Sequence, residues 1–195
     1  MNEKIRCLRE NMKRLDLDAM IVSNPINIRY LTNIDSEEGL LIITRKENIY
    51  LTHTMFLEAV NSVLTIMDEI VVVDQKDISK DEAQNFFLFC ENVGFEESYV
   101  TYEKYKTLKH KFRINSLVPT EGIVESQRIV KDEEEIKKIK KASEITDKCF
   151  SHLLEYIKRD MTEKEIALEI EIFMRKNGAD RNSISSYSSK WRKLK

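Results

Sequence analysis

The pattern of apolar residues changes at Pro119, and this change constrains the fold more than any other feature of the chain. Before Pro119, short apolar runs typical of buried strands alternate with segments whose apolar residues recur at helical spacing. After it, helical spacing alone continues to residue 180. We therefore expect an α/β domain over residues 1–122, with a mixed β-sheet flanked by helices, and a purely helical segment over residues 123–180.

The alternating part predicts a definite order of elements. In chain order they are a helix at 2–16, a strand at 18–23, a short helix at 27–32, strands at 40–44 and 48–52, a helix at 55–64, a strand at 70–74, a helix from Ser79 to about Val93, a strand at 99–100, a helix at 103–112 and a strand at 114–118. Ser79 and Glu82 form a capping box, Gly94 is expected to end that helix, and Pro119 is expected to stop the last strand.

The helical part contains two amphipathic helices. Acidic residues 133–135 occupy the first turn of a helix that continues nearly to Lys158, where the helix dipole favours negative charge. Thr162 and Glu165 form a capping box for the second helix, which Gly178 ends. Their apolar faces must cover something, yet no strand pattern comes after them. Residues 181–195 show neither helical nor strand periodicity and are expected to form a disordered tail.

Composition excludes several classes of protein. The 195 residues carry a net charge of −2, so no nucleic-acid partner is expected. No apolar run reaches the roughly 18 residues needed to cross a bilayer, and the N-terminus lacks the apolar core of a secretory signal, so no membrane partner is expected. The three cysteines are few and widely spaced, which is typical of reduced thiols in a cytoplasmic protein.

Candidate catalytic residues are few. His53, His110 and His152 never pair at helical spacing, and we favour a surface or core role for each over a ligand role. The acidic run 133–135 is interpreted as a solvated helix start, and the Phe86–Phe89 cluster as core helix. Neither Gly39 nor Gly94 lies in a phosphate-binding loop, and the serines of the tail lack a Gly-x-Ser-x-Gly context. The residues therefore predict no catalytic, cofactor-binding or metal-ligating site in this chain.

An ordered set of motifs resembles a known family. The stretch from Arg128 to Ala142 is similar to the R-x-x-K-x-x-x-E-I-x-x-I-x-x-A sequence that opens the catalytic domain of Xaa-Pro aminopeptidases and prolidases. The segments 161–166 and 177–179 resemble the next turn and the end of the second helix in that domain, with Asp160 in place of a usual glycine. Residues 19–32 resemble the strand–turn–helix of the creatinase/prolidase N-terminal domain. The family's Asp-x-Arg-Tyr is replaced here by residues 53–56.

This resemblance implies a creatinase/prolidase N-terminal domain over 1–122 and two helices of an incomplete "pita-bread" metallopeptidase domain over 123–180. Full-length enzymes of this family use two divalent metal ions, commonly manganese, with a bridging water or hydroxide that attacks the bond before proline. Their ligands are two Asp, one His and two Glu, all beyond residue 180. The resemblance therefore implies that this chain holds neither metal nor other cofactor.

The tail suggests a frameshift hypothesis. Residues 181–184 can be encoded so that the frame one base later reads Gly-Ile-Gln-Phe, and residues 187–192 so that it reads Ile-Val-Val-Ser-Gly. Both resemble the strand that comes next in the family's catalytic domain. The hypothesis is a frameshift near Asp180, and the nucleotide sequence of the gene tests it.

Three functions can be weighed from the sequence. The first is a catalytically inactive N-terminal fragment of a Xaa-Pro peptidase. The alternative is a non-catalytic binding or oligomerisation module, a pseudoenzyme that acts on a full-length relative. A working hydrolase is disfavoured because a metallopeptidase needs metal ligands to activate its water. Expected partners are a second copy in a dimer or other homo-oligomer, or a full-length paralogue. Proline-containing peptides would be partners of the intact family enzyme only.

Overall fold

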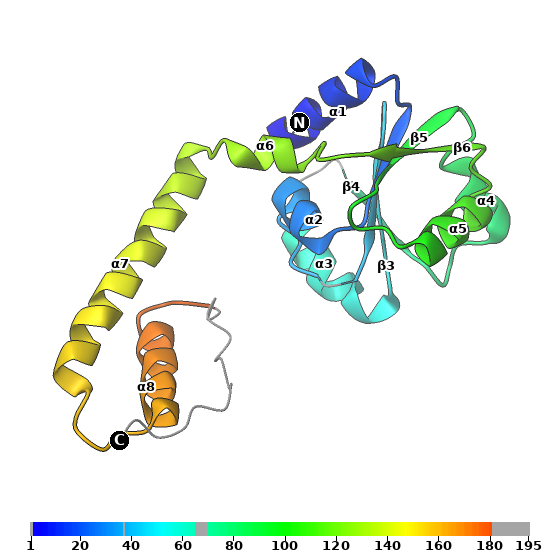
Figure 1. Ribbon diagram of the computed structural model, residues 1–195. Coiled ribbons are helices and arrows are strands. Elements are labelled where there is room, and N and C mark those ends of the chain that lie inside the picture. Colours follow the sequence, from blue (N-terminus) through cyan, green and yellow to red (C-terminus); the bar gives the residue numbers. More distant parts are fainter. Residues whose placement is uncertain (1, 37, 65–69, 181–195) are drawn as a thin grey trace. The chain divides into compact units, whose positions relative to one another are not determined.

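The computed structural model describes residues 2–36, 38–64 and 70–180, which form two compact units (Figure 1). The first unit ends at Val130 and the second begins at Lys131. Residues 123–130 thus belong to the first unit, beyond the boundary predicted after residue 122. The tail 181–195, predicted to be disordered, lies outside the described residues.

The first unit is built on a six-stranded mixed sheet with strand order β4-β3-β2-β1-β5-β6. The antiparallel pairs are β1–β2 and β2–β3, and the parallel pairs are β3–β4, β1–β5 and β5–β6. The predicted mixed sheet is therefore confirmed. The strands are β1 (Ala19–Val22), β2 (Leu40–Thr44), β3 (Asn48–Thr52), β4 (Ile70–Asp74), β5 (Asn92–Glu96) and β6 (Ser116–Thr120).

Helices cover both faces of this sheet, as Figure 1 shows. One face packs against α1 (Glu3–Arg14), α2 (Pro25–Thr32) and α3 (Leu57–Leu64), the last preceded by the short 3₁₀ helix η1 (Thr54–Phe56). The other face packs against α4 (Lys80–Asn85) and α5 (Tyr102–Lys111). The unit ends with α6 (Glu125–Ile129).

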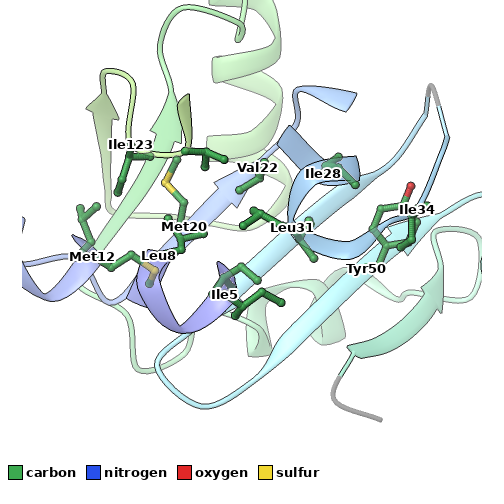
Figure 2. Close-up of a cluster of buried hydrophobic side chains, with 14 of the residues drawn as sticks. Ile5, Leu8, Met12, Met20, Val22, Ile28, Leu31, Ile34, Tyr50 and Ile123 are labelled. Atoms are coloured by element: carbon green, nitrogen blue, oxygen red, sulfur yellow. The ribbon is translucent and has the colours of Figure 1, made fainter. Parts of the chain in front are cut away.

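The core on the α1–α2 face is a direct result of helical and strand periodicity. Ile5, Leu8 and Met12 project from one stripe of α1 toward Met20 and Val22 of β1 (Figure 2). These side chains are at least 98% buried. Because complete burial of such a side chain is worth about 1.5–3 kcal/mol, this cluster contributes a large share of the driving force for folding.

The predicted helix from Ser79 to about Val93 is wrong in its second half. The capping box of Ser79 and Glu82 is confirmed, but α4 ends at Asn85 and β5 begins at Asn92. Gly94 lies inside β5 and does not end a helix. An added Cβ there would lie 2.8 Å from Sδ of Met20 and 2.9 Å from Cδ1 of Leu17. Glycine is therefore required for the close approach of core side chains to the strand.

The Phe86–Phe89 cluster is not the core helix that the sequence predicted. Phe87 is buried and meets Phe112 edge to face, with ring centroids 5.4 Å apart. Leu88 and Phe89 are 65% and 90% exposed, respectively, because the chain has turned after α4. Phe86 is half-buried and packs against the same core as Phe87, so a run of four apolar residues can suggest a core helix where only two of them reach the core.

Two predictions about strands in the last part of the first unit are also wrong, one about residues 99–100 and one about Pro119. Tyr99 lies in a turn and Val100 outside any strand, since the Val100 amide bonds back to the Glu96 carbonyl at 2.9 Å. Pro119 does not stop the last strand but lies within β6, opposite Phe95. β6 is an edge strand, and an edge is where a sheet tolerates a residue that lacks an N–H group.

The second unit contains the two predicted helices, α7 (Glu133–Tyr156) and α8 (Glu163–Lys176). The Thr162–Glu165 capping box is confirmed, and a second box joins Asp132 to Glu135 at the start of α7. Gly178 has a φ of +92°, as expected for the residue after a helix end. Asp160 has a φ of +75°, a conformation that costs a residue with a Cβ roughly 1–2 kcal/mol.

Candidate functional site

A buried carboxylate lies where the central parallel strands β1 and β5 end. Glu96, the last residue of β5, is only 2% exposed. Its Oε2 atom accepts hydrogen bonds from the backbone amides of Ser23 at 2.6 Å and Asn24 at 2.8 Å. Its Oε1 atom accepts from Nδ2 of Asn27 at 2.7 Å. The Ser23 hydroxyl also donates to Oε2, at 3.4 Å. Four donors therefore converge on one carboxylate and offset the cost of burying its charge.

Local sequence explains how the donors are aimed. Asn24 is the N-cap of α2 and accepts the Ile26 amide at 3.0 Å, while Pro25 occupies the first turn, where no amide hydrogen bond is needed. The amides of Ser23 and Asn24 are thus left free to bind Glu96. The carboxylate also lies at the positive end of the α2 helix dipole, which favours a negative charge there.

The same cluster reaches the last helix of the unit. Nδ2 of Asn27 also donates to Oε1 of Glu125 at 2.6 Å, and Nη1 of Arg128 donates to Oδ1 of Asn27 at 3.0 Å. Asn27 is fully buried, and its side-chain amide links α2 to Glu96 of β5 and to Glu125 and Arg128 of α6. We call Glu96, Asn27, Glu125 and Arg128 the Glu96 network. Every group in it that we have named is paired with another, which is typical of a structural element and not of a reactive group.

A second polar cluster lies at the carboxyl ends of the parallel pair β3 and β4. Asp74 is buried, and its Oδ1 and Oδ2 atoms accept from the Lys76 amide at 2.9 Å and the Thr54 hydroxyl at 2.5 Å, respectively. These two hydrogen bonds lower the pKa of Asp74, the Lys76 amide more strongly. His53 lies 3.9 Å from Glu38, and both side chains are largely exposed. Residues 53–56, which include His53 and Thr54, replace the Asp-x-Arg-Tyr of the resembled family.

A third cluster joins the two helices of the second unit. Nε2 of His152 lies 2.7 Å from Oε1 of Glu169, and the imidazole stacks on Phe173 with centroids 4.6 Å apart. Cys149 is the one buried residue among those described in this unit. Burial, and then the nearby charge of Glu169, raise the pKa of its thiol. The cluster therefore fastens α7 to α8.

The connection between α7 and α8 also frames an open hollow of about 470 Å³. Its lining is largely charged and lies at the exposed end of the helix pair. The lining residues are Glu155, Tyr156, Lys158, Arg159, Asp160, Met161 and Glu165. An apolar pocket with a few converging polar groups is the usual form of a ligand site, and this hollow does not have it.

The structure separates the candidate residues that the sequence offered. His53, His110 and His152 lie in three different places. Of the acidic run 133–135, interpreted as a solvated helix start, Glu133 and Glu134 are exposed, whereas Glu135 is half-buried and forms the capping box with Asp132. The serines of the tail lie outside the described residues. Within residues 2–36, 38–64 and 70–180, no group of three or more His, Cys, Asp or Glu side chains could hold a metal ion. The part of the chain described here therefore does not fit a two-metal centre. No helix in it is long and apolar enough to cross a membrane.

Sequence reasoning missed the Glu96 network and the His152–Glu169 pair. The signal for the first was partly present, because Asn24 and Asn27 come after an apolar strand at the point where a parallel sheet collects polar side chains. Glu96 could not be recognised while residues 80–93 were interpreted as one helix. The second pair depends on the packing of α7 against α8, which no local pattern specifies.

Two family models match the chain. One, described as the Creatinase/Prolidase N-terminal domain, covers residues 4–130, and one described as Metallopeptidase family M24 covers residues 137–190. An uncharacterized peptidase of Bacillus subtilis is 30% identical over 181 residues, which are 92% of this chain and 51% of that protein. A Xaa-Pro dipeptidase of Pyrococcus horikoshii is 28% identical over 183 residues, 93% of this chain and 50% of that protein.

Solved structures give the same result. A Xaa-Pro dipeptidase from Bacillus anthracis matches with a TM-score of 0.80 and 30% identity over 91% of this chain and 50% of its own. The prolidase of Pyrococcus horikoshii matches with a TM-score of 0.77 and 27% identity over 92% and 50%. The chain thus spans about half the length of the relatives it matches.

Proposed function

Because this chain belongs to the creatinase/prolidase N-terminal domain family, we propose that it serves as the N-terminal portion of a Xaa-Pro peptidase. The intact enzyme would hydrolyse a peptide bond that involves proline. The proposal rests on the extent of the match between this chain and its relatives. The match includes both units of this chain but only about half the length of each of these peptidases.

We further propose that the chain by itself does not hydrolyse peptides. Peptidases of the matched metallopeptidase family depend on divalent metal, which supplies a nucleophilic water near neutral pH. The described residues offer only pairs of candidate ligands, such as His53 with Glu38 and His152 with Glu169. Among the described residues, neither pair has a third side chain placed to bind the same metal ion. His152 also stacks on Phe173 and so contributes to the packing of α7 against α8.

The first unit would then contribute structure to the intact enzyme. Its Glu96 network fixes α6, the last helix of this unit, to the ends of β5 and α2 through Asn27. By its family resemblance, such a domain would screen substrates by size. A cytoplasmic location is part of the same proposal, and the free thiols of Cys7, Cys90 and Cys149 fit a reducing compartment.

The second unit supports a role as part of a larger domain. Both helices, and the residue that directly follows α7, keep large apolar side chains open to solvent, although each helix is amphipathic. The exposed members are Ile136, Ile139, Phe150, Leu154, Ile157, Leu168 and Ile172. Apolar surface of this kind marks a place where further polypeptide packs. The same observation favours the second candidate function, a binding module that docks on a full-length relative.

A peptidase assay tests the proposal. Purified chain is incubated with manganese and a Xaa-Pro dipeptide, with a chelated sample as control and the Pyrococcus horikoshii dipeptidase as reference. We expect no proline release above the chelated control. Metal-dependent release by this chain would overturn the proposed inactivity.

Gel filtration of a mixture with the full-length Bacillus subtilis relative separates the two candidate functions. Elution of the two proteins as separate species supports the fragment, whereas a joint species supports the binding module. A Phe150→Lys variant, changed at a position that is 63% exposed on α7, provides the control. It should abolish a joint species that depends on this apolar face.

A further inference from the structure

The two edges of the sheet in the first unit differ in a way that bears on association. β6 forms one edge and carries the exposed Pro119, which has no N–H group to offer a neighbouring strand. β4 forms the other edge. Among the strands of the described residues, only β3 pairs with it, on one side. Natural sheets block such edges with proline, charge or covering elements, since a free edge templates further strands.

The first four residues of β4 carry neither proline nor charge. Residues 70–73 read Ile-Val-Val-Val, an uncharged β-branched run with high preference for sheets. Val71 is 59% exposed, and Ile70, Val72 and Val73 are only partly buried. The charged end of the strand is already engaged, because Asp74 binds the Thr54 hydroxyl and the Lys76 amide.

We propose that β4 is the interface through which two copies of this chain join, edge to edge, into one continuous sheet. An uncharged β-branched strand is complementary to itself, so antiparallel pairing brings no like charges together. A two-fold axis through Val72 would place Val71 opposite Val73 of the second copy, with both side chains on the same face. This pairing would cover the exposed Val71 and satisfy the outward backbone groups of β4.

This proposal does not depend on peptidase chemistry, and it differs from association through the apolar face of α7 and α8. Ile70 and Val72 pack on the core beneath α1–α3, whereas Val73 packs on the core beneath α4 and α5. Both faces of β4 are therefore anchored, and the strand is held rigid for pairing. A preorganised edge loses little conformational entropy when a second strand is added.

Sedimentation equilibrium of the full chain tests the proposal with matched variants. The unaltered chain should dimerise, and Val71→Lys should weaken dimerisation at least about tenfold, because each lysine would lie opposite Val73 of the second copy and the two ammonium groups would lie at diagonal positions on the same face of the joined sheet. Val71→Thr, which keeps the β-branched shape, and Leu88→Lys, the same charge change at another exposed site, should leave dimerisation unchanged. A monomeric unaltered chain, or a dimer insensitive to Val71→Lys, would overturn the proposal.

A further variant and a hydrogen-exchange measurement distinguish the β4 interface from other modes of association. If Leu154→Lys on α7 abolishes the dimer while Val71→Lys does not, association occurs through the helices and the β4 interface is wrong. Hydrogen exchange on the unaltered chain needs no variant and so does not depend on how Val71→Lys folds. Amides of residues 70–74 should gain protection as the protein concentration rises. Exchange there that is independent of concentration would contradict the pairing.

Discussion

Replacement of Glu96 by glutamine is a sharp test of the network that organises the first unit. The change keeps the size of the side chain but removes its charge and converts one acceptor into a donor. If the new amide oxygen accepts the Ser23 and Asn24 amides, the new NH₂ group faces the NH₂ group of Asn27. If Asn27 turns over, its oxygen no longer accepts from Arg128. At least one buried polar contact is lost in either arrangement.

The expected cost can be worked from these contacts. A buried polar group left without its partner costs about 1–3 kcal/mol, and hydrogen bonds to a charged group are each stronger than neutral ones. We expect Glu96→Gln to lower the free energy of unfolding by about 2–4 kcal/mol. For a unit of this size, that loss lowers the melting temperature by on the order of 10 °C.

Urea unfolding followed by circular dichroism measures this loss, and hydrogen exchange in α2 and β5 assigns it to the first unit. The control is Glu97→Gln, the same substitution at the exposed neighbouring position. It should change stability by less than about 0.5 kcal/mol. Equal stability of Glu96→Gln and Glu97→Gln would refute the view that the buried carboxylate holds α2 and α6.

Three further outcomes are expected. His152→Ala removes the contact with Glu169 and should lower hydrogen-exchange protection in α8 by about 1–3 kcal/mol, leaving β5 unchanged; unchanged α8 protection would contradict the role of this pair. Gly94→Ala should cost about 1–3 kcal/mol in urea unfolding through overpacking, and an unaltered midpoint would show that the core relaxes freely. Because hydrogen bonds depress the pKa of Asp74, its contribution to stability is present above the ordinary aspartate pKa and is lost as the pH falls through the depressed value. The advantage of the unaltered chain over Asp74→Asn, followed by thermal unfolding, should therefore shrink on acidification below about pH 4, and a constant difference would argue against it.

Much of the sheet could be predicted because strands buried on both faces leave a simple signal. The strands at 40–44, 48–52 and 70–74 were predicted with the bounds that the structure shows, since each is a short apolar run between polar turns. The helix α7 was predictable because the acidic residues 133–135 mark its first turn, and α8 because its capping box marks the start and Gly178 marks the end. These signals are local, so the elements that they mark can be predicted without knowledge of tertiary packing.

The errors arose where tertiary contacts decide. Gly94 resembles a helix end in sequence, but its lack of a side chain serves the approach of Met20 and Leu17 to β5. Pro119 resembles a strand terminator, yet β6 is an edge strand and tolerates it. The Glu96 network depends on strand order, because β5 lies beside β1 although some seventy residues separate Glu96 from Ser23 and Asn24. No window of sequence contains that information.

Titration of the purified chain with manganese, followed by calorimetry, tests most directly the claim that the hydrolytic centre is not contained in this polypeptide. The account predicts no saturable uptake of two ions per chain, because the described residues bring together only pairs of candidate ligands. Tight binding of two ions, released by a chelator, would contradict the account.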